Sequence, residues 1–97
     1  MNILNVEAIA ALCRRYRVRS LSLFGSAARG EMGADSDYDF LVEFEPPYDG
    51  YADRYFGLLE GLQALLGRPV DLVVAGSIRN PYLLRAIQES HVQLYAA

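Results

Sequence analysis

Two apolar runs, each long enough for a strand, enclose a short segment rich in Gly, Ser and Asp. The first run ends at Phe24 and is followed by Gly25-Ser26, and the second begins at Phe40, directly after Asp37-Tyr38-Asp39. Residues two apart in a strand point to the same face, so we expect the Asp37 and Asp39 carboxylates to share one place. Two carboxylates about 5 Å apart repel by roughly 3 kcal/mol at an effective dielectric near 20. The pair therefore predicts a bound cation.

Gly25-Ser26 stands where the first strand would give way to a short helix over residues 26–30. Free backbone amides at the start of a helix bind phosphate. The other interpretation is an ordinary strand-to-helix turn with Ser26 as its N-cap, which any α/β protein can contain. In combination with the paired aspartates, the Gly-Ser predicts a site for phosphoryl or nucleotidyl transfer.

A third carboxylate, Asp71, lies inside the otherwise apolar run Val70–Val74. A charge in a buried strand costs free energy unless it is paired or binds a metal. If this strand lies beside the one that carries Asp39, three carboxylates converge and can hold one or two Mg²⁺ ions. The alternatives are that Asp71 reaches water from an edge strand, and that Asp37 and Asp39 are solvated turn residues.

Helices and strands alternate in the predicted organisation of the chain. Apolar residues recur at helical spacing over residues 5–16, 51–66 and 81–89, whereas residues 18–24, 38–44 and 70–75 are typical of strands. Alternation of Val92 and Leu94 adds a short edge strand. We predict an α/β (α+β-like) fold, a small mixed β-sheet with helices packed against it, as a single domain over residues 1–97.

Composition excludes several classes of function. A net charge of −3 argues against direct nucleic-acid binding, and no apolar run approaches membrane-spanning length. The basic side chains are all Arg, so any side-chain contact to phosphate must come from Arg. Cys13 is the only cysteine, which rules out an internal disulfide and suits a reducing compartment. We therefore expect a cytoplasmic protein.

Several segments resemble the minimal nucleotidyltransferase family of the DNA polymerase β superfamily. They are Leu23–Ser26, Ala28–Glu31, Ser36–Val42 and Val70–Val73. The resemblance extends over nearly the whole chain and implies a polymerase-β-type nucleotidyltransferase fold. The Gly-Ser alone carries no weight, but its spacing to the Asp-x-Asp and to a later strand Asp is specific.

The resemblance also implies roles for individual residues. Asp37, Asp39 and Asp71 would be the catalytic carboxylates and the Mg²⁺ ligands, with Asp71 helping to deprotonate the acceptor hydroxyl. Gly25 and Ser26 would hold the triphosphate of ATP. Arg29 matches a recurrent position of the motif and would contact phosphate; alternatively it would pair with a nearby acidic side chain.

Small members of this family resemble the antitoxin halves of two-gene modules, whose partner is an all-helical HEPN RNase toxin. The implied reaction is the transfer of AMP from ATP to a tyrosine hydroxyl of that toxin, and we expect a hetero-oligomer with it. Two alternatives stay open. One is a binding module that neutralises the toxin without catalysis. The other is nucleotidyl transfer to a small molecule, which the lack of a second substrate-binding domain disfavours.

Overall fold

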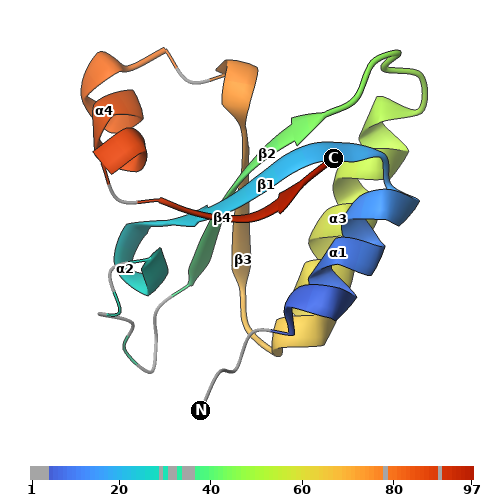
Figure 1. Cartoon of the computed structure of the whole chain (residues 1–97), viewed down its shortest axis with the longest axis horizontal. Coiled ribbons are helices and arrows are strands. Elements are labelled where there is room, and N and C mark those ends of the chain that lie inside the picture. The colour runs from blue at the N-terminus through green and yellow to red at the C-terminus, as the bar shows by residue number, and fades with distance from the viewer. Residues whose placement is uncertain (1–4, 29, 31–32, 34–36, 78, 90) are drawn as a thin grey trace.

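The computed structural model describes residues 5–28, 30, 33, 37–77, 79–89 and 91–97. Its elements, in chain order, are α1 (Val6–Arg15), β1 (Val18–Phe24), α2 (Gly25–Ala28), β2 (Tyr38–Phe44), α3 (Tyr51–Leu66), β3 (Val70–Val74), η1 (Ala75–Ser77), α4 (Pro81–Glu89) and β4 (Val92–Ala96) (Figure 1). The order confirms the prediction, with α2 beginning one residue earlier and ending sooner than expected. None of the helices in this described part is long and apolar enough to cross a membrane.

The four strands form one mixed sheet in the order β3-β2-β1-β4. Strand β1 pairs antiparallel with β2 and with β4, whereas β2 and β3 are parallel. Parallel neighbours need a crossover connection, and α3 supplies it. Strands β3 and β4 are consequently the edges of the sheet, and the predicted small mixed sheet with packed helices is confirmed.

One face of the sheet carries the hydrophobic core, against which α1 and α3 pack (Figure 1). The buried residues of β2 alternate along the strand and are each at most 3% exposed: Tyr38, Phe40, Val42 and Phe44. Leu58 and Leu62 of α3 meet this face and are fully buried. Asp39, which lies between two of the buried residues, therefore faces the opposite side. Figure 1 shows α2 and α4 on that side.

Two glycines of α3 allow this helix to lie close to α1. A Cβ at Gly57 would overlap the ring of Tyr16, and a Cβ at Gly61 would lie 2.7 Å from Cδ2 of Leu12. Carbon atoms do not approach so closely without displacement, so the two helices can pack in this way only because these positions lack a side chain. This packing fixes the position of the crossover helix α3. Because β3 follows α3 after a short connection, it also fixes the position at which β3 begins.

A buried arginine, which the sequence analysis did not identify, joins the connections at the other end of the sheet. Arg54 is 7% exposed, and its guanidinium lies 5.2 Å from the ring centre of Phe44. It donates hydrogen bonds of 2.9–3.0 Å to the backbone oxygens of Tyr16, Arg17, Glu45 and Pro47. These bonds offset the cost of burying the charge. One feature of the sequence could have indicated this burial. Arg54 precedes Leu58 and Leu62 at intervals of about one helical turn, so it lies on the same buried face of α3.

Candidate active site

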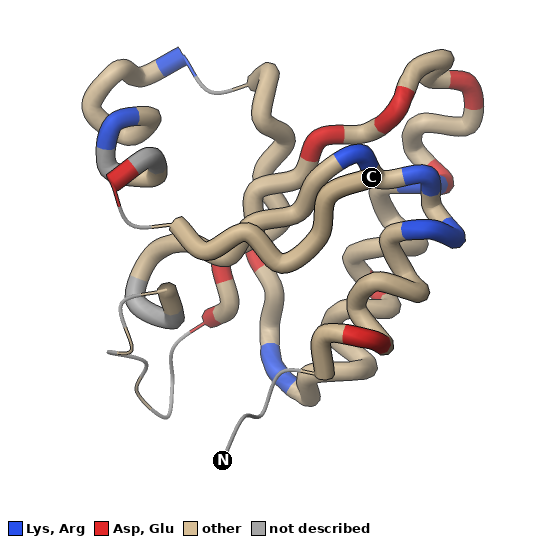
Figure 2. The backbone as a smooth tube through the Cα atoms, viewed as in Figure 1, with Lys and Arg blue, Asp and Glu red and all other residues tan. Residues whose placement is uncertain are grey.

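Asp39 of β2 and Asp71 of β3 are direct partners across the parallel pair. Phe40 and Leu72, the residues that follow them, are buried in the core, so both carboxylates lie on the opposite face of the sheet. Neighbouring strands are about 4.8 Å apart, which places the two residues side by side in the sheet. Figure 2 shows acidic positions, in red, on neighbouring parts of the backbone there. The structure thus brings together two acidic residues that are far apart in the sequence, as the prediction required.

The electrostatics of Asp39 show that the third predicted carboxylate is also nearby. Burial raises the pKa of the Asp39 carboxyl above its ordinary value, and the negative charges of Asp71 and then Asp37 raise this pKa further. Asp37 lies one residue before β2 and is exposed. Mutual repulsion disfavours the ionised form of Asp39, and a bound cation would relieve that repulsion.

Asp71 is not a charge within a buried strand: it reaches water from an edge strand, which was the alternative that the sequence left open. Strand β3 is an edge of the sheet, and Asp71 is exposed. Its neighbours are apolar because the core side of β3 packs against α3, not because the strand is covered on both faces.

Gly25 lies directly against this carboxylate pair. A Cβ at Gly25 would stand 2.5 Å from Oδ2 of Asp39, and the residue has φ +73°, a backbone conformation that favours glycine. The glycine turn therefore lies next to the carboxylates. The sequence indicated this proximity only through the combination of the Gly-Ser with the aspartates, not through either motif alone. Ser26 is the second residue of α2. The predicted phosphate contact Arg29 lies outside the described residues.

The donor chemistry of the site fits a divalent cation, since carboxylate oxygens are the ligands that Mg²⁺ prefers. Among the described residues, however, no three Asp, Glu, His or Cys side chains already form a group that could hold a metal ion. Asp37 and Asp71 are exposed and therefore free to change rotamer. A cation would recruit them by side-chain rotation.

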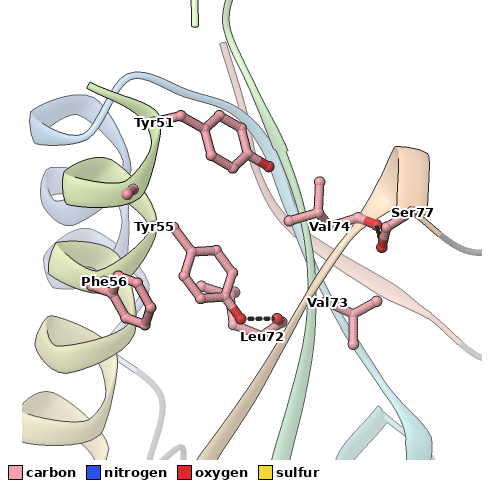
Figure 3. A pocket seen from close by; sticks show the side chains of 8 residues that line it. Tyr51, Tyr55, Phe56, Leu72, Val73, Val74 and Ser77 are labelled. Carbon is pink, nitrogen blue, oxygen red and sulfur yellow. Dashed lines mark hydrogen bonds between the residues drawn. The ribbon is translucent and has the colours of Figure 1, made fainter. Parts of the chain in front are cut away.

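A groove of about 520 Å³ lies between α3 and β3 (Figure 3). The Tyr55 hydroxyl donates a 2.6 Å hydrogen bond to the backbone oxygen of Leu72 there. Burial, followed by the negative charge of Asp71, raises the pKa of Tyr55, which places this tyrosine near the edge of the site. The sequence placed Tyr55 in an apolar stripe and gave no sign of this position. The described residues that line the groove include no carboxylate and no arginine, so this lining is not suited to a metal-bound triphosphate.

Comparison with known proteins agrees with this geometry. The family model described as a nucleotidyltransferase domain matches residues 6–94. A protein of Methanocaldococcus jannaschii that is provisionally named a protein adenylyltransferase is 46% identical over 76 residues, which are 77% of this chain and 75% of that protein.

Two solved structures share the fold over almost the whole chain. One is the crystal structure of a toxin–antitoxin with AMP-PNP, which has a TM-score of 0.75 and 28% identity and covers 97% of this chain and 75% of that one. The other is a tri-AMPylated Shewanella oneidensis HEPN toxin in complex with an MNT antitoxin. It has a TM-score of 0.67 and 25% identity, and covers 100% of this chain and 74% of that one.

A mixed sheet with paired carboxylates on neighbouring parallel strands, and a glycine turn packed against them, defines an enzyme that transfers nucleotidyl groups. The chain belongs to the nucleotidyltransferase domain family. The resemblance to minimal nucleotidyltransferases that the sequence indicated is thereby confirmed.

Proposed function

We propose that this chain is an antitoxin that transfers AMP from ATP, with Mg²⁺, to a tyrosine hydroxyl of a HEPN RNase toxin and so silences it. The observation that carries the proposal is the side-by-side placement of Asp39 and Asp71 against Gly25. The similar solved structures support it, since one contains AMP-PNP and the other an AMPylated HEPN toxin.

The predicted residues would divide the work between metal and phosphate. Asp37, Asp39 and Asp71 would hold one or two Mg²⁺ ions, which when bound polarise phosphate oxygens and offset their charge. The absence of a side chain at Gly25 lets the backbone of this turn lie directly against Asp39, so a phosphate bound by the turn would be close to the carboxylates. Backbone amides at Ser26 and the guanidinium of Arg29 would complete the phosphate contacts.

In the proposed reaction, the tyrosine oxygen of the acceptor attacks the α-phosphorus of ATP. A new phosphorus–oxygen bond forms, the bond to the bridging oxygen of the β-phosphate breaks, and pyrophosphate leaves with its electron pair. The hydroxyl proton passes to the Asp71 carboxylate and then to water. Asp71 can serve a macromolecular acceptor because it is exposed on an edge strand.

The test is to incubate the purified chain with the HEPN protein encoded in the adjacent gene, ATP labelled at the α-phosphate, and Mg²⁺. We expect label on a toxin tyrosine, no transfer in EDTA, and a loss of at least about 100-fold in Asp39→Asn. Asp49→Asn is the matched control, because Asp49 lies in an exposed loop, with its carboxylate 3.9 Å from Arg17, and should keep full activity.

Absence of transfer by the unaltered chain would contradict the proposal. If Asp39→Asn transferred no AMP but still protected cells from the toxin, neutralisation would come from binding alone. Label on a small molecule instead of the toxin would identify a different acceptor class.

A further inference from the structure

Helix α4 presents an apolar surface that the proposed reaction does not use. Its beginning is fixed locally, because Oδ1 of Asn80 accepts hydrogen bonds from the backbone N–H groups of Tyr82 and Leu83 at 2.9 and 3.4 Å. Within the described residues, four of the eight exposed large apolar side chains lie on α4 or at the start of β4. Tyr82, the most exposed of them, is 83% accessible.

We define the α4 surface by the exposed apolar side chains of α4 and the arginines beside them: Arg79, Tyr82, Leu83, Leu84 and Arg85. Val92 does not belong to it, because Val92 pairs with Leu23, whose side chain faces the core. Arg79 and Arg85 are both exposed. Neither forms an ion pair with any described residue. Glu89, which is exposed one helical turn after Arg85, offsets one of these charges. The surface therefore combines apolar area with a net charge of +1, on a chain whose net charge is −3. Exposed apolar patches of this kind mark interaction sites.

The α4 surface lies close to the carboxylates. Helix α4 is on the side of the sheet that faces away from α1 and α3 (Figure 1), which is also the side of Asp39. Val92 pairs with Leu23 of β1, and Leu23 pairs with Phe40, the residue that follows Asp39. Helix α4 leads into β4, and only β1 separates β4 from β2, so two strand spacings, about 10 Å, lie between β4 and Asp39, and a third separates β4 from Asp71.

We propose that the α4 surface is the docking site of the protein whose tyrosine receives AMP. The partner it fits presents an apolar helix face bordered by Asp or Glu side chains that meet Arg79 and Arg85. The identity of this partner as the HEPN toxin rests on the proposed function. An exposed carboxylate site holds a protein acceptor only weakly by itself, so binding energy must come from a neighbouring surface.

Charge decides between this partner and other occupants. A second copy of the α4 surface would bring the same net positive charge to the interface, and like charges across an interface oppose association. A membrane surface attracts clusters of several basic residues, whereas this surface has two and the chain is acidic. An acidic-bordered protein surface is complementary to both the arginines and the apolar side chains.

The test compares Leu83→Asp with Val6→Asp. Both residues are exposed to nearly the same extent, 46% and 43%, and both lie in the first turn of a helix. Because an acidic residue there is favoured by the helix dipole, neither substitution should unfold its helix. The measurements are calorimetric affinity for the adjacent-gene HEPN protein and affinity for Mg²⁺-ATP alone. We expect Leu83→Asp to weaken toxin binding roughly 10-fold or more, with nucleotide binding unchanged and Val6→Asp like wild type.

Wild-type affinity of Leu83→Asp for the toxin would overturn the docking site, as would a wild-type chain that does not bind the toxin. The docking site would also be overturned if the substitution changed only self-association, or only binding to vesicles that contain anionic phosphatidylglycerol. Failure of the proposed function looks different: the toxin would bind through α4, but no AMP would be transferred. If Leu83→Asp transferred AMP to the toxin with an unchanged KM for the toxin, the docking site would be refuted but the proposed function would not.

Discussion

Asp39 should make the metal-free protein less stable than an uncharged residue would. The pKa of its carboxyl is raised in the folded chain by burial and by the charges of Asp71 and Asp37. Folding therefore favours the protonated form. The resulting loss of stability begins as the pH rises past the ordinary carboxyl pKa and is complete above the higher folded-state pKa. Below the ordinary carboxyl pKa, both states are protonated and the penalty vanishes. Asp39→Asn should thus stabilise the protein at pH 7 and have little effect near pH 3.

The magnitude follows from the register of β2 and β3. Carboxylates on neighbouring strands, about 5 Å apart, repel by about 3 kcal/mol at a dielectric of 20 and by about 0.8 kcal/mol at that of water. Asp71 is exposed and Asp39 is partly buried, so solvent screening places the repulsion near the lower figure. We expect a gain of about 1 kcal/mol, or about 4–8 °C in Tm for a domain of this size.

The assay is urea unfolding in EDTA of wild type, Asp39→Asn, Asp71→Asn and the double variant. The cycle should give a repulsive coupling free energy of about 1 kcal/mol between the two positions. Mg²⁺ should stabilise wild type but not Asp39→Asn, and Asp49→Asn should stay within about 0.5 kcal/mol of wild type. A less stable Asp39→Asn in EDTA, or a coupling of zero, would refute the reasoning.

Three further changes test other parts of the structure. Gly25→Ala should cost about 1–2 kcal/mol more than Gly30→Ala and abolish transfer, because both glycines have positive φ but only a Cβ at Gly25 meets Asp39; equal urea midpoints would contradict this. Arg54→Met should cost about 3 kcal/mol or more in urea unfolding, since buried backbone oxygens lose their donors; a loss under 1 kcal/mol would contradict that. Cys13 is fully buried and burial raises the pKa of its thiol to about 12, so iodoacetamide should label it only at the rate of unfolding. Fast labelling of the folded chain would disprove its burial.

Local signals made much of the molecule predictable. Apolar periodicity placed the helices and strands, and Asn80-Pro81 marked the start of α4, because capping and side-chain alternation act within a few residues. The Asp-x-Asp spacing likewise depends only on the geometry of one strand. To interpret this spacing as part of a nucleotidyl-transfer site, however, the glycine turn at the end of the neighbouring strand β1 is also needed.

Residues 70–74 show where local information ends. Their composition is that of a core strand, and nothing in them specifies which strand they pair with or that they form an edge. The pairing of Asp39 with Asp71 and the exposure of Asp71 arise from the crossover through α3. The burial of Arg54 likewise depends on backbone oxygens from two loops, one of which is distant in the sequence, and backbone groups carry no sequence signature. The sequence alone therefore determined which acidic residues are available for nucleotidyl transfer. Only the tertiary structure decided that two of them stand side by side, because strand pairing is a long-range choice made by packing.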